Sequence, residues 1–239
     1  MDWLIQLWSV KDETAKDFPG TLKRLGELGY KGVEFAGYGG YSAEEMKKML
    51  DDAGLYSVGS HTGIEVFRDG FEEELEYHKV LGSKYIIIPY VELKTKEQID
   101  ELIYLLNKWS PVAKEAGIML GYHNHQHEFE KFDGKYIMDI IAENTDDNVI
   151  LELDVFWAEY ADVNPVEYIK AMGKKIGLIH VKQIGKTTEN CQLSEGRIDM
   201  AEVVEASKYA KYFIVEQEEY DKPVWEITEN NIKYLKGIK

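Results

Sequence analysis

Cysteine, proline and basic residues are scarce in this sequence. The single cysteine, Cys191, excludes an internal disulfide and a zinc site built on cysteines. Five prolines and 44% hydrophobic residues indicate a substantial folded core rather than a disordered chain. The 28 basic residues form no cluster and are outnumbered by 44 acidic ones, which gives a formal charge of −16. We therefore expect neither a nucleic-acid partner nor binding to an anionic membrane surface.

Long apolar runs are also missing. No segment approaches the length of a membrane span, and Met1-Asp2-Trp3 lacks the basic and apolar regions of a signal peptide. The expected location is the cytoplasm.

Short hydrophobic runs alternate with longer amphipathic segments along the whole chain. Most of the runs are almost continuously apolar, as in parallel strands covered on both faces. The predicted strands are Trp3–Ser9, Gly32–Phe35, Tyr56–His61, Tyr85–Pro89, Ile118–His123, Val149–Asp154, Ile176–Val181 and Tyr212–Glu216.

Several intervening segments carry helix start signals. Ser42 with Glu45, and Thr95 with Gln98, have the spacing of a capping box, and Asn164-Pro165 predicts an N-cap followed by a first-turn proline. Alternating strands and helices predict an α/β protein: one (β/α)8 TIM barrel over residues 1–239. A doubly wound open sheet is the competing fold, but it often has a glycine-rich phosphate loop after the first strand, and none follows here.

The most informative stretch is 121–129, GYHNHQHEF, which contains three of the six histidines. Alternating His side chains beside a Glu are costly to bury unless they bind a metal, a proton or a polar ligand. A solvated histidine-rich loop is the alternative for this stretch taken alone.

Other polar residues also gather where predicted strands end, which in this barrel is the end that carries the chemistry. Five of the six histidines lie at such positions, and only His78 falls inside a predicted helix. The residues at these ends are Gln6, Trp8, Glu34, His61, Pro89-Tyr90, His123 to Glu128, Glu152, Asp154, His180, Lys182 and Glu216-Gln217-Glu218.

Three of these residues, Asp154, His180 and Glu216, are the main candidates for function. Glu152 and Asp154 point to the same side of one strand, and two buried carboxylates require a cation or a shared proton. His180 lies beside Lys182 on one face, although a lone buried histidine is more often part of a core. Glu216 is an ionisable group at the end of a buried strand.

A second set of residues is expected to contact the substrate. Glu34 and His61 are candidates for substrate binding or for support of the ligands. Trp8 and Trp157 either pack in the core, as aromatic residues commonly do, or form a wall against a sugar ring. Asp, Glu and His together suit a hard or borderline divalent cation, with Mn²⁺ or Mg²⁺ favoured by the carboxylates and Co²⁺ or Zn²⁺ also compatible.

The ordered set of motifs resembles the sugar phosphate isomerase/epimerase superfamily, the xylose-isomerase-like TIM barrels. The resemblance covers nearly the whole chain and is specific for the superfamily but not for a substrate. Its motifs are Ile5-Gln6-Leu7-Trp8-Ser9-Val10, Gly32-Val33-Glu34-Phe35, Tyr122-His123-Asn124-His125 with Glu128-Phe129, Leu151-Glu152-Leu153-Asp154, Ile179-His180-Val181-Lys182 and Val215-Glu216-Gln217.

The resemblance implies a divalent metal held by residues from strands 5 to 8. Asp154, His180 and Glu216 match the last three ligands, and Glu128 is nominated as the first because Gly121 stands where the epimerases carry Glu. His123 and His125 are expected to bind substrate, and either is an alternative ligand to Glu128. A second departure is Gln183, where many relatives have Asp.

The implied reaction is proton abstraction next to a carbonyl of a carbohydrate, through an enediolate. Glu128 and Glu216 are expected to act as the acid–base pair, and Lys182 and His61 are expected to stabilise oxyanion charge or bind hydroxyls. Members of the superfamily often pair, so a homo-oligomer is expected.

Three alternatives stay open. The same apparatus could eliminate water or an aglycone, as a dehydratase or keto-glycoside lyase does. Gly121 keeps open a catalytically inert sugar-binding barrel. An endonuclease IV-like phosphodiesterase is disfavoured by the acidic charge and the short list of histidines. The segment Gly185–Arg197 is the main candidate for a lid, with Arg197 able to meet an anion or to stay in a solvated loop.

Overall fold

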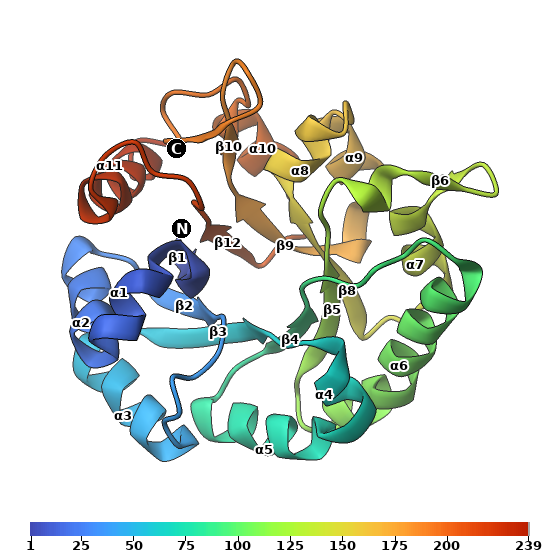
Figure 1. Cartoon of the computed structure of the whole chain (residues 1–239), viewed down its shortest axis with the longest axis horizontal. Helices are drawn as coiled ribbons and strands as arrows, with labels where there is room; N and C mark the ends of the chain where they lie inside the picture. Colours follow the sequence, from blue (N-terminus) through green and yellow to red (C-terminus); the bar gives the residue numbers. More distant parts are fainter. Residues whose placement is uncertain (239) are drawn as a thin grey trace.

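Eight parallel strands close into a barrel in the computed structural model, which describes residues 1–238 (Figure 1). Around the barrel the strands follow the order β1-β12-β9-β8-β5-β4-β3-β2. Their bounds are β1 Trp3–Gln6, β2 Gly32–Phe35, β3 Tyr56–His61, β4 Tyr85–Ile88, β5 Met119–His123, β8 Val149–Asp154, β9 Ile176–Val181 and β12 Tyr212–Val215. The predicted (β/α)8 barrel is confirmed.

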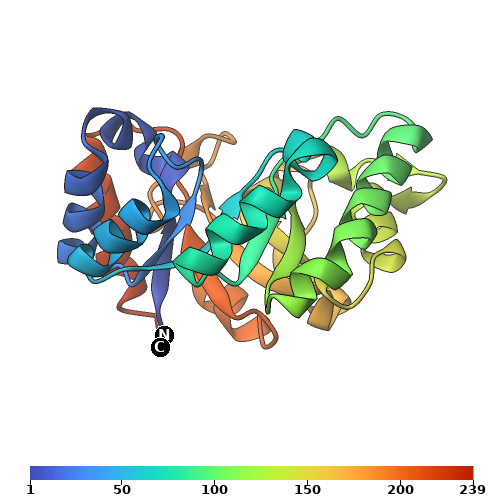
Figure 2. The same cartoon turned by 90° about the horizontal axis from the view of Figure 1, so that it is seen from below.

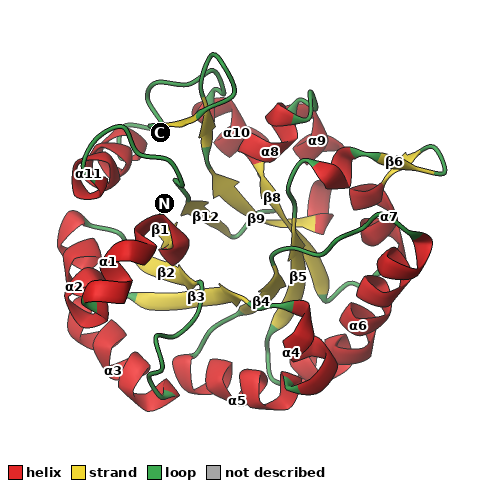
Figure 3. Cartoon of the chain, in the orientation of Figure 1, coloured by secondary structure: helices red, strands yellow, loops and turns green. Residues whose placement is uncertain are grey.

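Helices form a ring outside the strands, as the red and yellow elements of Figure 3 show. Seen from the side in Figure 2, they run along the outer surface of the barrel. Their bounds are α1 Lys11–Lys16, α2 Phe18–Leu28, α3 Ala43–Ala53, α4 Ile64–Asp69, α5 Phe71–Leu81, α6 Lys96–Glu115, α7 Ile137–Asn144, α8 Val155–Tyr160, α9 Pro165–Met172, α10 Met200–Ala206 and α11 Val224–Leu235. Among residues 1–238, none of them has the length and apolar character needed to cross a membrane.

Short elements decorate the connections between these strands and helices. They are the 3₁₀ turns η1 Leu7–Val10, η2 His127–Phe129 and η3 Gly173–Lys175, and the hairpins β6 Lys131–Phe132 with β7 Lys135–Tyr136 and β10 Gln183–Ile184 with β11 Asn190–Cys191. The second hairpin structures part of the predicted lid segment, Gly185–Arg197.

The predicted helix starts are present. Ser42 and Glu45 form a reciprocal capping box on α3, as do Thr95 and Gln98 on α6. The side chain of Asn164 accepts from the backbone at the start of α9. These side chains satisfy N–H groups that have no partner inside the helix, which fixes where each helix begins.

The first strand is shorter than predicted. The run Trp3–Ser9 was expected to be a single strand, but β1 ends at Gln6 and the chain turns into η1. The Gln6 side-chain oxygen accepts a hydrogen bond from the backbone N–H of Trp8 at 3.0 Å, which stabilises the turn. Trp8 is therefore carried on a turn at the rim rather than inside a strand.

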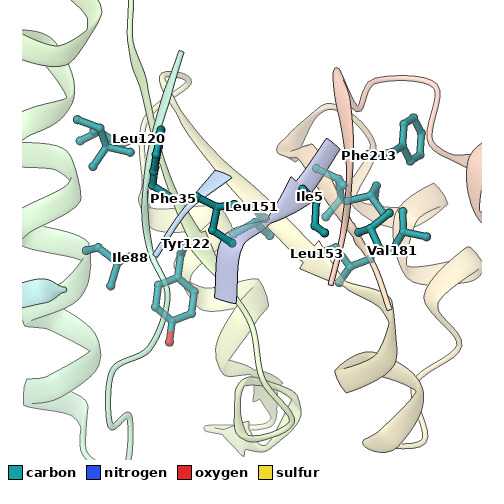
Figure 4. Packing of buried hydrophobic residues seen from close by; sticks show 14 of the residues in the cluster. Ile5, Phe35, Ile88, Leu120, Tyr122, Leu151, Leu153, Val181 and Phe213 are labelled. Atoms are coloured by element: carbon teal, nitrogen blue, oxygen red, sulfur yellow. The ribbon is translucent and has the colours of Figure 1, made fainter. Parts of the chain in front are cut away.

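Side chains alternate along each strand between two apolar layers. One side faces the helices, and Figure 4 shows Ile5, Phe35, Leu151 and Phe213 among the side chains of this larger cluster. The other side faces the barrel interior and forms a separate cluster at the closed end, made of Leu4, Val58, Tyr85, Ile87, Ile150, Leu178 and Ile214. Interior positions two residues further along the strands lie at the open end, where the polar residues are.

Candidate active site and metal centre

Four buried side chains from different strands converge at the open end of the barrel. Each offers a ligand atom within 4.8 Å of the others, and we call them the outer group: His123, Asp154, His180 and Glu216. They come from β5, β8, β9 and the residue after β12, and all four are buried. Nδ1 of His180 lies 3.3 Å from a Glu216 oxygen, and Nε2 of His123 lies 4.0 Å from an Asp154 oxygen. The convergence of Asp154, His180 and Glu216 follows from their equivalent places at the ends of neighbouring strands.

Asp154 uses its two oxygens differently. Oδ1 caps α8 by accepting from the backbone N–H groups of Phe156 at 2.8 Å and Trp157 at 3.2 Å. Oδ2 is buried and accepts no hydrogen bond from the described residues. A buried carboxylate oxygen that accepts no hydrogen bond is unfavourable unless a cation compensates its charge, and the Lys182 ammonium lies 3.6 Å away, beyond hydrogen-bond distance. The donor set, two imidazoles and two carboxylates around this oxygen, fits a divalent cation.

A carboxylate beneath the outer group holds the far sides of the imidazoles. Oε2 of Glu152 lies 2.7 Å from Nε2 of His61, 3.2 Å from Nδ1 of His123 and 3.3 Å from Nε2 of His180. These are the opposite nitrogens of His123 and His180 from those that face Asp154 and Glu216. Glu152 therefore orients both rings so that their other nitrogens point into the outer group, an arrangement common around bound metals.

Glu34 supports the same layer from β2. Its Oε2 accepts from the Gln6 side-chain amide at 2.8 Å and lies 2.8 Å from Nε2 of His180. Burial, followed by the charge of Glu152, raises the pKa of Glu34. We call Glu34 and Glu152 the inner carboxylates, and both have an oxygen without a hydrogen-bond partner among the described residues.

Lys182 is a fully buried cation beside the outer group. Its Nζ donates to Glu216 at 3.1 Å and to Glu218 at 2.7 Å, and lies 3.6 Å from Asp154 Oδ2. Burial opposes its charge, but Glu216 and Asp154 outweigh burial and raise the pKa of Lys182. The ammonium is held by carboxylates on several sides and stays protonated.

The ionisable groups of the site have pKa values displaced in opposite directions. Burial raises the pKa of Asp154 to about 6 despite the opposing effect of Lys182. Burial also acts against the charged form of Glu216, but Lys182 and His180 hold its pKa well below the usual range. Burial and the neighbouring His180 lower the pKa of His123, whereas the surrounding carboxylates outweigh burial and raise that of His180. Such divergence within one cluster is typical of functional sites.

A central pocket of about 410 Å³ opens above these residues. It is lined by Trp8, Ala36, His61, Pro89, Tyr90, His123, His125, Glu216 and Glu218. Glu216 and His123 thus belong to both the outer group and the pocket wall, so a molecule in the pocket contacts the outer group directly.

A model of the xylose isomerase-like TIM barrel family matches residues 22–238. The chain belongs to that family. This confirms the resemblance seen in the sequence, and the barrel topology agrees with it.

Solved structures of other xylose isomerase-like barrels share the fold. A sugar phosphate isomerase/epimerase from Parabacteroides distasonis ATCC 8503 has a TM-score of 0.86 at 24% identity, covering 100% of this chain and 95% of the other. The IolI protein, solved with a zinc atom, has a TM-score of 0.78 at 17% identity, covering 100% and 98%. An L-ribulose 3-epimerase has a TM-score of 0.75 at 17% identity, covering 99% and 94%. No curated protein sequence matches this one.

Glu128 does not lie with the outer group in this barrel. Its carboxylate accepts from the Tyr122 hydroxyl at 2.5 Å and from the backbone N–H of His125 at 2.8 Å, and lies 3.0 Å from His127. Tyr122 packs in the cluster that faces the helices, the opposite side of β5 from His123. The geometry therefore does not favour Glu128 as the strand-5 ligand. Its carboxylate is bound by Tyr122 on the helix-facing side of β5.

Gly121 was expected to stand at the height of the metal ligands, but it lies two residues nearer the closed end of the barrel than His123. It pairs with Ile150, and a Cβ there would come within 2.5 Å of Ile87 and 2.9 Å of the Ile150 side chain. His123 pairs with Glu152, at the height of the site. The interior residue of β5 that reaches the outer group is thus His123, which was expected to bind substrate and only alternatively to be a ligand. Gly121 lies against the apolar cluster at the closed end.

The remaining predicted substrate contacts lie around the pocket. Trp8, His61 and His125 line it, whereas Trp157 lies beside it, with its ring centroid 5.3 Å from that of His125. Arg197 does not face the pocket, because it binds the Glu159 carboxylate at 2.9 Å and the Gly185 carbonyl at 3.1 Å.

Three residues of the site and its pockets could not be given a role from the sequence pattern. Glu152 was noted only as facing the same side as Asp154, and Tyr90 and Glu218 only as residues at strand ends. The period of two along β8 was the available signal for Glu152. Tyr90 and Glu218 lie in loops, whose direction no periodicity reveals.

Proposed function

We propose that the protein is a divalent-metal-dependent isomerase or epimerase of a sugar, acting by proton transfer at a carbon next to a carbonyl. The observation that carries the proposal is the outer group, whose two imidazoles and two carboxylates converge at the floor of the central pocket. Solved relatives that are named as epimerases share the fold, and one of them contains D-allulose.

His123, Asp154, His180 and Glu216 would hold the cation, with His123 in the position first assigned to Glu128. Bound there, a divalent cation would polarise the substrate carbonyl and make the neighbouring C–H more acidic. Zinc is favoured over the magnesium or manganese expected from the sequence, because a second imidazole, that of His123, replaces one carboxylate of the predicted set. The remaining steps belong to residues of the chain.

Glu216 would remove the proton. Its Oε2 accepts a hydrogen bond from Lys182 and contacts His180, and the side chain lines the central pocket. The C–H bond breaks, its electrons move toward the carbonyl oxygen, and the proton passes to Glu216. Lys182, which stays protonated, balances the charge of Glu216 before transfer and that of the enediolate after it.

The direction of proton return decides between isomerisation and epimerisation. Glu216 and Glu218 both bind the same ammonium of Lys182, so they serve one side of the pocket. Return from that side to the neighbouring carbon gives an isomer. His61 lines the pocket from β3 and would deliver a proton to the other face, which gives an epimer.

The test is NMR analysis of a ketose and aldose panel in D₂O with metal-loaded protein. Incorporation of deuterium into a product of unchanged composition supports the proposal, and the labelled carbon separates isomer from epimer. An unsaturated product would instead support the dehydratase or lyase reaction. Neither exchange nor turnover with the metal-loaded protein would contradict both and leave a sugar-binding barrel.

The Asp154→Asn variant is the matched control. Asn retains the oxygen that caps α8 but removes the negative charge that a cation would bind. Any exchange that persists in this variant is independent of the outer group.

A further inference from the structure

A side pocket of about 320 Å³ adjoins the central pocket at the open end of the barrel. It lies between the segments that follow β4 and β5 and the start of α8. Its wall includes Tyr90, Leu93, His125, Gln126, His127 and Trp157. Tyr90 and His125 line both pockets, so these two side chains form part of the boundary between them.

Aromatic rings dominate the boundary between the two pockets. The ring centroid of Tyr90 lies 5.4 Å from that of His125 and 5.1 Å from that of His127, and His125 lies 5.3 Å from Trp157. Tyr90 is 54% exposed, although nothing in the described part of the chain requires an exposed aromatic ring at this place. Trp8, 43% exposed, stands at the rim of the central pocket. Exposed aromatic faces that gather around a pocket mark a surface for a ring-shaped ligand.

The charges of the residues that line the two pockets disfavour an anionic ligand group. No Lys or Arg lines the central pocket, which carries Glu216 and Glu218 instead. Lys182 beneath it is already bound by carboxylates. In the side pocket Lys94 pairs with Glu92, and Glu130 adds a further negative charge. A phosphate here would meet carboxylates, and Lys11, whose ammonium lies 3.8 Å from the Trp8 ring centroid, is not among the residues that line either pocket.

We propose that the ligand is an uncharged glycoside with two rings. The reacting sugar, which keeps its carbonyl, occupies the central pocket above the outer group. A second ring, joined through a glycosidic oxygen at a carbon other than the carbonyl carbon, occupies the side pocket against Tyr90 and Trp157. This inference rests on the proposed function for its carbohydrate ligand, but it concerns recognition rather than the reaction.

Calorimetric binding to the metal-loaded protein tests the second ring. The probes are methyl and phenyl glycosides of glucose, galactose and fructose in both anomeric forms, with the corresponding sugar phosphates. For at least one sugar, the phenyl glycoside should bind about tenfold more tightly than the methyl glycoside, because one aromatic ring gains a stacked and desolvated site. The phosphates should bind more weakly than the neutral sugars.

Two variants locate the effect. Trp157→Leu removes an aromatic wall of the side pocket, and Gln126→Trp fills the pocket without deleting a packed side chain. Both should abolish the preference for the phenyl glycoside, and Gln126→Trp, which alters no residue that lines the central pocket, should leave binding of the methyl glycoside within about threefold. Tyr104→Ala is the control, because Tyr104 is an exposed tyrosine in a different groove, on α6, and should change neither value.

The inference would be overturned by equal binding of methyl and phenyl glycosides, by tighter binding of a phosphate, by binding of no glycoside, or by a preference that survives both variants. A phenyl preference lost in the variants, found together with no deuterium exchange on any sugar, would support this inference while contradicting the proposed reaction.

Discussion

The two ends of the barrel interior are built from the same strands but differ completely in chemistry. At the closed end Leu4, Ile150, Leu178 and Ile214 form part of an apolar plug. Two residues further along the same strands come Gln6, Glu152, His180 and Glu216, all of which are buried. A single step of the strand period thus separates a core from a cluster of ionisable groups.

The comparison shows why the polar layer can be costly and still be retained. The apolar cluster at the closed end requires only side chains of the right volume and shape, and it stabilises the fold through burial of apolar surface. The layer above it places carboxylates on an apolar floor, where electrostatic interactions are strong and unpaired charges are unfavourable. His61 and His180, whose pKa values are raised, together with Lys182 and, on our proposal, a cation compensate those charges.

The largest expected effect comes from removing one charge at the open end. Asp154→Asn should abolish metal binding and lower activity at least about a thousandfold, about 4 kcal/mol in the barrier. The metal-free variant should be at least as stable as the parent at neutral pH, because burial already opposes the charge of Asp154. Calorimetric metal titration and thermal unfolding check the two parts. Retained metal affinity would contradict the assignment of Asp154.

A pair of substitutions on β5 tests the two levels directly. Gly121→Glu should destabilise the fold strongly, because its Cβ alone would approach Ile87 to 2.5 Å and a charge would enter the apolar plug. His123→Glu should fold and still bind a divalent cation, because a carboxylate replaces an imidazole at the height of the outer group. Soluble yield, unfolding temperature and metal affinity are the measurements. A stable, metal-binding Gly121→Glu variant of the His123→Ala protein would show that the levels are misassigned.

A truncation in the plug should affect stability alone. Leu4→Ala removes a fully buried side chain beneath Gln6, which is not a proposed ligand. We expect a loss of about 2–5 kcal/mol in the free energy of unfolding. Metal affinity of the folded variant should match that of the parent. Denaturant unfolding and calorimetry separate the two, and a parallel loss of metal affinity would mean that the ends are coupled.

Much of the fold, and part of the site, could be predicted from the sequence. Near-continuous apolar runs and capping boxes such as Ser42 with Glu45 identify the strands and helix starts because these signals are local. Asp154, His180 and Glu216 could be grouped because each ends a strand of a parallel barrel.

The choice of the strand-5 ligand depends on a different kind of information. Choosing between Gly121, His123 and Glu128 requires the register of β5 against β8, which depends on contacts between distant segments. The side pocket could not be predicted either, since it depends on how the loops after β4 and β5 fold over each other. The metal-binding roles of Asp154, His180 and Glu216, the expected oligomer and the cytoplasmic location stay predictions.

A smaller effect is expected from the carboxylate that orients the imidazoles. Glu152→Gln keeps the size of the side chain but weakens its interactions with His61, His123 and His180. Metal affinity should fall about 10- to 100-fold without loss of the fold. Glu152→Asp, which retains the charge, should recover part of the affinity. Unchanged affinity in Glu152→Gln would show that Glu152 has only a structural role.

The smallest effect is a gradual dependence on pH. The pKa of Asp154 in the folded protein is about 6, above its ordinary value, so its contribution to metal-free stability is present at low pH and is lost as pH rises through about 6. A cation binds the ionised carboxylate, and His180, whose pKa is also raised, must release a proton to bind through its ring.

Deprotonation of Asp154 and of His180 therefore both favour metal binding as the pH rises. Lys182 and Glu216 are the other charged groups that face Asp154. The rise in unfolding temperature on adding metal should grow from about pH 5 to about pH 8. A metal-induced rise that is largest at the acidic end would show that these groups are not ligands.

An anomalous difference map from crystals soaked in Zn²⁺ or Mn²⁺ tests the central claim most directly. The account predicts one strong peak at the open end of the barrel, within bonding distance of His123, Asp154, His180 and Glu216 and absent from Asp154→Asn crystals. A peak at Glu128, or no ordered peak among these four side chains, would contradict it.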